Sequence, residues 1–424
     1  FLCAALLLLA TSAAFADAPP DYRITSPYAG VNWETDGVFK ANLHAHTTFS
    51  DGNHSMAEVV EEYYRQGYDI LATSDHGIVS VPWDQSPRTV FPLDIQNWGK
   101  ERPVLSSERL AEITAGVNRG GRGMLRVPQS IEMNAAVVNK SHVNGFFGGW
   151  GQGWWGLEND YRSAIDQTER SGGISHLNHP GDWIQSSDDA AIARDPKNVN
   201  FFAALFRDYP SLVGMEIYNR VDTVTRHDRI LWDELLRRLV PEGRLLWGFA
   251  NDDSHVMSDI GGTAEFFLMP SNTAQNLRKA MESGAFFASS RRDRVVLGDA
   301  FVGDAQAAFP MVSKITVDEA ADVITLTVTD TEKVEWIADG KVIATGAVLS
   351  LREHAEEITC YVRAQLIGPG GITATQPFAL EDGSGYVFPD DSLQGWEKFK
   401  FDLLLFLRSN MLVALIELLI DQIG

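Results

Sequence analysis

The segment His44-Ala45-His46-Thr47-Thr48-Phe49-Ser50-Asp51-Gly52 directly follows the hydrophobic run Val38–Leu43. Side chains repeat every two residues along a strand, so both imidazoles of the His-x-His pair point to one side and can reach one metal ion. Three similar clusters follow other hydrophobic runs: Ser74-Asp75-His76-Gly77, His176-Leu177-Asn178-His179-Pro180 and Asn251-Asp252-Asp253-Ser254-His255. Packing alone does not explain this clustering. The pattern predicts metal ligands brought together from distant parts of the chain.

Strand-like and helical patterns alternate from residue 38 to about residue 300. The strand-like runs are Val38–Leu43, Asp69–Thr73, Met124–Ile131, Gly173–Ser175, Leu212–Tyr218, Arg244–Ala250 and Glu265–Met269. The helical patterns are Ser55–Gln66, which opens with a Ser-x-x-Glu capping box, Ser107–Val117, Asn159–Arg170, Arg229–Val240 and Thr273–Ser283. This alternation predicts an α/β fold, either a parallel barrel or a doubly wound sheet, and seven strands favour the barrel. The clusters then lie at the C-terminal strand ends, where barrel enzymes place their chemistry.

The pattern changes after about Pro310. Short, alternating, β-branched runs and the turn signal Asp339-Gly340 predict a small antiparallel β-sandwich over residues 310–381. The leucine-rich segment 396–424 predicts an amphipathic C-terminal helix, interrupted by too many charges to span a membrane. We expect this helix to pack against the body of the protein or against a second subunit, giving a homo-oligomer.

The N-terminal residues are typical of an exported protein. An apolar run over Leu2–Ala10 precedes Ala14-Phe15-Ala16, a small-x-small cleavage pattern. We expect a signal peptide over residues 1–16, a lead-in over residues 17–37, and a periplasmic or extracellular location with no transmembrane segment in the mature chain. The mature chain keeps one cysteine, Cys360, so no internal disulfide is expected.

The 424 residues carry a formal net charge of -22, with 45% hydrophobic residues. The composition allows a large core. A strongly acidic surface repels nucleic-acid phosphates and anionic lipids, so neither is expected as a general partner. A locally positive metal site still attracts a small phosphate.

Taken together, the four clusters resemble the PHP (polymerase and histidinol phosphatase) superfamily of metal-dependent phosphoesterases, over about Lys40 to Ser290. The matching residues are His44-x-His46-Thr47-x-x-Ser50-Asp51-Gly52, Asp75-His76, His179-Pro180 and Asp253-x-His255. In addition, Glu132 resembles the bridging carboxylate of the family, and His142 resembles the histidine that follows it. The resemblance implies a distorted seven-stranded β/α barrel of the PHP type, similar to a TIM barrel, over residues 38–300.

The resemblance also implies three ligand sets. The sets are His44, His46, Glu132 and Asp253 for one ion, Glu132, His142 and His179 for a second, and Asp51, His76 and His255 for a third. Mixed imidazole and carboxylate ligands suit two or three divalent ions of zinc, manganese or iron. Because these sets contain only three carboxylates, the ions keep excess positive charge, which attracts phosphate and lowers the pKa of a bridging water. We expect a metal-bridging hydroxide, rather than a protein side chain, to attack phosphorus.

Several further residues are expected near the site. Asp75 and His176 are candidates to orient or support ligands, and Lys140, Arg220 and Arg291 are candidates to contact the substrate. The glycine- and aromatic-rich stretch Ala135–Gly156 predicts a loop over the barrel mouth.

The first hypothesis is therefore an exported phosphoesterase acting on a small phosphate ester, with monoester and diester both open. The alternative is an amide or lactone hydrolase on the same metal cluster. Cationic residues at the barrel mouth favour the first, and an aromatic, uncharged mouth favours the second. A non-enzymatic scaffold with the β-sandwich as binding module is a third possibility, but the intact ligand set argues against it.

Overall fold

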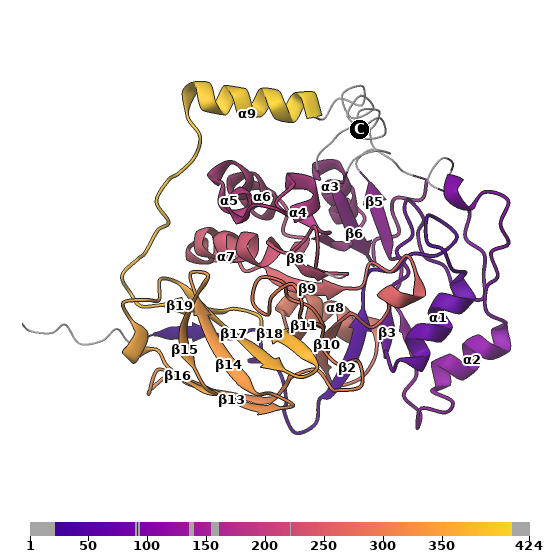
Figure 1. The fold of residues 1–424 in the computed structure, drawn as a ribbon, viewed down its shortest axis with the longest axis horizontal. Helices are drawn as coiled ribbons and strands as arrows, with labels where there is room; N and C mark the ends of the chain where they lie inside the picture. Colours follow the sequence, from indigo (N-terminus) through magenta and orange to yellow (C-terminus); the bar gives the residue numbers. More distant parts are fainter. Residues whose placement is uncertain are drawn as a thin grey trace, which may run out of the picture.

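The computed structural model describes residues 22–408, except residues 90, 92–93, 135–139, 154–160 and 221. The expected signal peptide and residues 409–424 of the expected C-terminal helix lie outside the described residues. The described chain is a mixed α/β structure (Figure 1), which confirms the predicted α/β class. In this part of the chain, no helix is long and apolar enough to cross a membrane.

The strands form three sheets. The first sheet has the order β1 (Arg23–Thr25), β19 (Phe378–Glu381), β17 (Tyr361–Gly368), β18 (Gly371–Ala374), β11 (Phe286–Ser290), β10 (Thr263–Met269), β2 (Gly37–Asn42), β3 (Ile70–Leu71), β4 (Leu125–Arg126), with β14 (Lys333–Ala338) joining β17 to β15 (Lys341–Thr345). The second is β5 (Ile131–Asn134), β6 (His142–Phe146), β7 (Ile174–Leu177), β8 (Leu212–Asn219), β9 (Trp247–Asn251). The third is β12 (Met311–Asp318), β13 (Val323–Thr329), β16 (Val348–Ser350).

The α-helices are α1 (Met56–Arg65), α2 (Ser107–Ala115), α3 (Arg162–Arg170), α4 (Pro180–Ile184), α5 (Ala190–Arg194), α6 (Pro196–Asp208), α7 (Asp228–Leu239), α8 (Ala274–Ser283) and α9 (Gly395–Arg408). All five helices expected between residues 55 and 283 are present, with shifted ends. The capping box of α1 is confirmed, because the Ser55 side chain accepts a hydrogen bond from the Glu58 backbone and the Glu58 carboxylate accepts one from the Ser55 backbone. Helices α4, α5 and α6 were not predicted.

Two groups of parallel strands carry the sequence clusters at their C-terminal ends. Strands β2, β3 and β4 pair in parallel, and so do β7, β8 and β9. Two isolated parallel bridges, Ala45–Ser254 and His76–Glu132, join the two sheets just beyond the strand ends. These bridges bring all the clusters to one side. The single seven-stranded barrel stays a prediction, since the strands divide between two sheets and β6 runs antiparallel to both of its neighbours.

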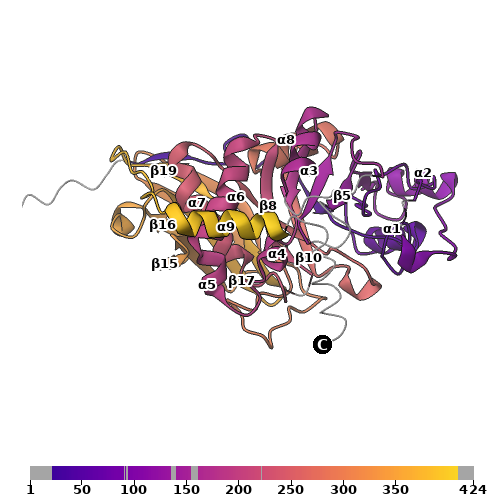
Figure 2. The ribbon, with the colours of Figure 1, turned by 90° about the horizontal axis from the view of Figure 1, so that it is seen from above.

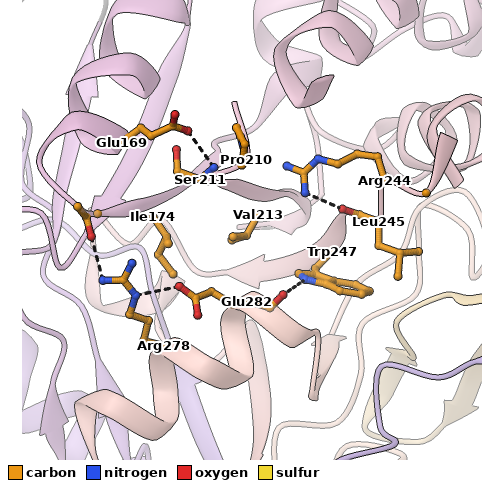
Figure 3. A pocket seen from close by; sticks show the side chains of 13 residues that line it. Glu169, Ile174, Pro210, Ser211, Val213, Arg244, Leu245, Trp247, Arg278 and Glu282 are labelled. Carbon is orange, nitrogen blue, oxygen red and sulfur yellow. Dashed lines mark hydrogen bonds and ion pairs between the residues drawn. The ribbon is translucent and has the colours of Figure 1, made fainter. Parts of the chain in front are cut away.

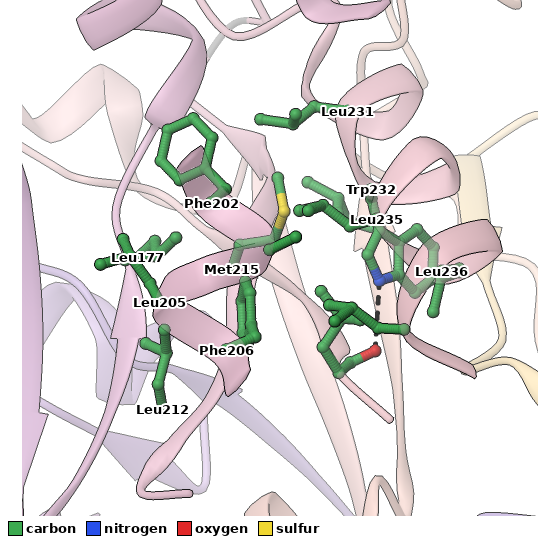
Figure 4. Close-up of a cluster of buried hydrophobic side chains, with 14 of the residues drawn as sticks. Leu177, Phe202, Leu205, Phe206, Leu212, Met215, Leu231, Trp232, Leu235 and Leu236 are labelled. Carbon is green, nitrogen blue, oxygen red and sulfur yellow. Dashed lines mark hydrogen bonds between the residues drawn. The ribbon is translucent and has the colours of Figure 1, made fainter. Parts of the chain in front are cut away.

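A hydrophobic cluster between the second sheet and the helices fixes this arrangement (Figure 4). Phe202 and Phe206 from α6 pack with Trp232 from α7 over Met215 of β8, all fully buried. The indole of Trp232 also donates a hydrogen bond of 3.2 Å to the Leu246 carbonyl just before β9. Burying an aromatic side chain of this kind contributes about 3 kcal/mol.

The prediction of a loop over Ala135–Gly156 is wrong for the segment that forms β6. This segment pairs with β5 and β7 and carries Phe146 into the core. A side chain at Gly145 would place its Cβ 2.8 Å from Met133 Cε, so glycine allows close packing here and does not mark a flexible loop. Trp154 and Trp155 lie outside the described residues.

The C-terminal strands are antiparallel, as expected, and two layers share one core. The layer β12-β13-β16 contributes Ile324 and Leu326 to the hydrophobic cluster that contains Trp336 and Leu366 of the facing sheet. That facing sheet continues through β18 into β11, where Ala288 is the register partner of Ala374. The boundaries 38–300 and 310–381, and a separate sandwich, therefore stay predictions.

Candidate metal centre

Glu132 on β5 is the fully buried centre of the site. Its two oxygens are surrounded by five imidazoles: Oε2 lies 3.2 Å from His44 Nε2, 3.1 Å from His46 Nε2 and 3.0 Å from His76 Nδ1, and Oε1 lies 3.0 Å from His142 Nδ1 and 3.5 Å from His179 Nε2. These side chains come from the ends of β2, β3 and β7 and from the start of β6. A carboxylate in this position can bridge two cations.

Two more carboxylates complete the cluster. Asp253, just after β9, places Oδ1 3.1 Å from His46 Nε2 and 3.3 Å from His44 Nε2. Asp51 places Oδ2 3.1 Å from His255 Nε2. All nine predicted ligands therefore lie in one continuous group of side chains.

The nine residues do not divide quite as the family resemblance implies. Potential ligand atoms lie within 4.8 Å of one another in three groups: His44, His46 and Asp253; His46, Asp51, His76 and His255; His76, Glu132 and His142. His46 therefore also lies beside Asp51 and His255 of the third predicted set. His76, predicted for the third set, also lies beside Glu132 and His142 of the second. His179 contacts Glu132 but belongs to none of the three groups.

The chemistry of this donor set fits divalent ions. Glu132 Oε2 and His76 Nδ1 are both buried, and neither has a hydrogen-bond partner among the described residues, although they lie 3.0 Å apart. Their lone pairs converge without a hydrogen bond, which is the geometry a cation needs. Burial alone would lower the pKa of His44 and raise that of Glu132. Burial is the largest single effect on each, but the opposite charges of several neighbours together outweigh it. The pKa of His44 is therefore raised well above its usual value, and the pKa of Glu132 is lowered well below its usual value.

The backbone at the site is strained. His179, Asp253 and Arg220 have φ values of 28°, 43° and 48°, in the left-handed region that favours glycine. Each such residue costs about 1–3 kcal/mol and persists only where its surroundings hold it. The strain aims the imidazole of His179 and the carboxylate of Asp253 toward the centre.

Asp75 supports the first cluster and belongs to none of the three candidate ligand groups. Its carboxylate accepts hydrogen bonds from the Thr47 backbone (2.7 Å), the Thr47 hydroxyl (2.8 Å) and the Ser50 hydroxyl (2.7 Å). His176 is fully buried below the cluster and stacks on Phe249 with ring centroids 4.7 Å apart. Both residues lie where supporting roles were expected.

Two of the three predicted substrate-contacting cations line the cavity over the cluster, which has a volume of about 330 Å³. Lys140 Nζ lies 2.9 Å from Asp182 Oδ1, and Arg220 Nε lies 3.1 Å from Asp253 Oδ2. The third, Arg291, lies elsewhere: it donates to the carbonyls of residues 304, 307 and 370 and stacks on Phe309. Its position after β11 suggested a site role, but its guanidinium group is hydrogen-bonded to these three backbone carbonyls instead.

Sequence reasoning missed two supporting residues, Asn178 and Asn144, and marked a third, Glu216, only as the end of a strand that faces the site without binding metal. Asn178 donates a hydrogen bond of 2.8 Å to Glu132 Oε1 and another of 2.9 Å to Asn144 Oδ1. Glu216 on β8 accepts from His44 Nδ1 at 2.8 Å. Asn178 lies inside a histidine motif and Glu216 ends a strand, which are usable signals, whereas nothing in the sequence singles out Asn144.

A second cavity, of about 570 Å³, lies at the opposite, N-terminal ends of β7, β8 and β9 (Figure 3). Its two cations are already used: Arg278 pairs with Glu282, and Arg244 donates to backbone carbonyls. No histidine lines it among the described residues. The chemistry therefore belongs to the metal centre.

Comparisons with known proteins give distant structural similarities only. No family model matches the chain, and no curated protein matches it. Among solved structures it is similar to a two-domain protein containing a predicted PHP-like metal-dependent phosphoesterase from Bacteroides vulgatus (16% identity, covering 86% of this chain and 91% of that chain, TM-score 0.41). It is also similar to a lesion-specific endonuclease from Pyrococcus furiosus (10% identity, 58% and 56%, TM-score 0.34) and to an amidohydrolase from Chromobacterium violaceum (15% identity, 51% and 87%, TM-score 0.28). These similarities say nothing about the substrate of this chain.

Proposed function

We propose that this protein is an exported, PHP-like metal-dependent phosphoesterase that hydrolyses a small phosphate ester. The observation that carries the proposal is the convergence of six imidazoles on the carboxylates of Asp51, Glu132 and Asp253, below a small cavity. Two or three divalent ions held there supply Lewis acidity, positive charge for phosphoryl oxygens and the means to activate a water. Which metals bind is left open by the donor set.

The residues of the chain contribute binding and orientation. Arg220 and Lys140 present cationic groups to the cavity, where they can contact non-bridging phosphate oxygens. Glu132 and Asp253, which line the cavity, would hold the ions, and Asp75 fixes the loop that carries Asp51. A cavity of about 330 Å³ suits a small ester rather than a polymer.

The alternative, an amide or lactone hydrolase, requires an uncharged aromatic mouth. The described part of the cavity lining contains two cations and, apart from histidines, no aromatic side chain. Two aromatic residues of the stretch 135–156 are engaged in hydrophobic clusters. Phe146 is fully buried in one cluster, and Trp150 packs against another. These positions favour the phosphoesterase.

The test is hydrolysis of p-nitrophenyl phosphate and bis-p-nitrophenyl phosphate by the purified protein, with bound metals quantified by mass spectrometry. We expect turnover together with two or three bound metals, both lost in the His44→Ala/Asp253→Ala double variant. A His354→Ala variant, altered in the C-terminal layer, serves as control and keeps both. Full metal loading without turnover of either ester favours the amide or lactone hydrolase, and absence of bound metal contradicts the proposal.

Export is a separate proposal that rests on residues 1–16. A fusion of residues 1–30 to a reporter that is active only outside the cytoplasm tests it. We expect reporter activity and a new N-terminus at Asp17, and an uncleaved, inactive fusion contradicts export.

A further inference from the structure

Glu216 is a buried carboxylate that hydrogen-bonds to two predicted metal ligands and belongs to none of the three candidate ligand groups. Its Oε1 accepts a hydrogen bond of 2.8 Å from His44 Nδ1. Its Oε2 accepts one of 2.9 Å from the backbone N–H of His179, the residue with φ of 28°. One carboxylate therefore restrains the ring of one ligand and the strained backbone of another.

A β-bulge in β8 places a second polar side chain beside it. Residues 216 and 219 are three apart, so in a regular strand their side chains would point to opposite faces. In β8, Glu216 is the register partner of Phe249 and Tyr218 that of Ala250, which leaves Ile217 as an extra residue. The bulge turns Asn219 to the same side as Glu216.

Asn219 extends the restraint to a third ligand. Its amide Nδ2 lies 2.9 Å from Glu216 Oε2 and 3.3 Å from Asp253 Oδ2. Because Asp253 also has a left-handed backbone, with φ of 43°, this amide helps to hold a strained carboxylate in place. Glu216 and Asn219 together thus join ligands from the ends of β2, β7 and β9.

We propose that Glu216 is the main positioning residue of the metal centre. By accepting the Nδ1 proton of His44, it fixes the tautomer in which Nε2 presents its lone pair to the ions. By accepting the His179 N–H, it holds the turn that aims the His179 ring at Glu132. Supporting partners of this kind are typically worth 10- to 100-fold in metal affinity. The inference rests on the proposed metal centre.

Glu265 on β10 offers a matched control. It is also a fully buried carboxylate and accepts a hydrogen bond of 3.2 Å from the Ala250 backbone, but among the described residues it makes no hydrogen bond or ion pair with any of the nine predicted ligands. Replacing either glutamate by glutamine keeps the side-chain shape at a fully buried position. At position 216, however, the new amide group must face a donor, either His44 Nδ1 or the His179 N–H.

The experiment measures zinc affinity of wild type, Glu216→Gln and Glu265→Gln by competition with a chelator, together with urea unfolding of the metal-free proteins. We expect Glu216→Gln to lose about 10- to 100-fold in the affinity of the tightest site, while Glu265→Gln binds as wild type does. The donor left unpaired by Glu216→Gln lowers the stability of the metal-free protein, whereas a metal-free variant that is already largely unfolded without urea would attribute the loss of affinity to structural damage. Equal zinc affinity in wild type and Glu216→Gln overturns the inference.

Two further outcomes are informative. If wild type itself binds no zinc, manganese or iron, the proposed function fails rather than the role of Glu216. If Glu216→Gln does not fold, Asn219→Ser replaces it, because this variant removes only the amide that joins Glu216 to Asp253. We then expect a smaller, several-fold loss of zinc affinity, and no loss overturns the inference.

Discussion

His176 is a buried imidazole whose titration couples stability to pH. Burial lowers its pKa from 6.5 to about 4. Between these values the unfolded chain binds a proton that the folded chain does not, so the free energy of unfolding falls as the pH drops through this window.

A His176→Phe variant lacks this contribution. Between about pH 7 and about pH 5, we expect metal-free wild type to lose about 2 kcal/mol more than the variant in urea unfolding. A His354→Asn control keeps the wild-type pH dependence, and equal slopes for wild type and His176→Phe contradict the prediction.

Asp75 carries three hydrogen bonds that shape the first metal-binding loop. In an Asp75→Asn variant, the new amide group faces donors of Thr47 or Ser50, and each buried unsatisfied donor costs about 1–3 kcal/mol. We expect urea unfolding to show a loss of this size and metal titration to show weaker binding. Asp208→Asn, at an exposed aspartate, leaves both unchanged. Unaltered stability of Asp75→Asn would show that the loop does not depend on these bonds.

Seven of the nine candidate ligands could be predicted because they are histidines and carboxylates at short, fixed spacings after strands, whereas Glu132 on β5 and His142 at the start of β6 were named only through the family resemblance. Glu216 and Asn219 could not be assigned a role, because their shared orientation depends on a bulge that leaves no mark in the sequence. Arg291 shows the opposite error. It follows a strand, as a site residue does, but its guanidinium group donates hydrogen bonds to the backbone carbonyls of Ala307 and Gly370.

The N-terminus of α1 shows how a local signal fixes an element. Ser55 and Glu58 each satisfy a backbone N–H that the first helical turn leaves unpaired. We expect Ser55→Ala to lower the free energy of unfolding by about 1 kcal/mol in urea titration. Thr273→Ala, at the cap of α8, provides a second capping site for comparison, with a loss of similar size. No change at Ser55 would mean that tertiary packing alone defines the start of α1.

Elements with strong local signals were predictable, whereas those shaped by tertiary contacts were not. Helices α1 and α8 have caps and amphipathic spacing. Strand β6 consists largely of small and polar residues, so its sequence is typical of a loop. These residues are present because β6 packs closely against Met133 and borders the metal centre. The five-residue helices α4 and α5 are too short to give a periodic pattern.

At the scale of the whole molecule, α9 presents an apolar face that the described part of the body does not cover. The helix crosses above the helices on the second sheet (Figures 1 and 2), and Phe401 and Leu405 pack against the main core. Three apolar side chains of α9, spaced by three and four residues, stay exposed: Trp396, Phe399 and Leu403.

We expect this face to meet its copy in a second subunit, so light scattering should give a dimer for wild type and a monomer for Leu403→Glu. Glu397→Gln on the same helix keeps the dimer, and a monomeric wild type contradicts this prediction.

The α/β part and the C-terminal layer are expected to unfold together. Arg363 on β17 makes a buried two-bond ion pair with Asp233 on α7, at 2.8 and 2.7 Å. Gln376, between β18 and β19, exchanges hydrogen bonds of 2.8 Å with both backbone groups of Gly248 on β9. Losing one partner of a buried ion pair costs about 3–5 kcal/mol, so neither part is stable once the other unfolds.

Calorimetry should therefore show one transition, which shifts as a whole when the metal centre is saturated. Two transitions, of which only one responds to metal, would instead show that residues 310–381 fold as a domain of their own.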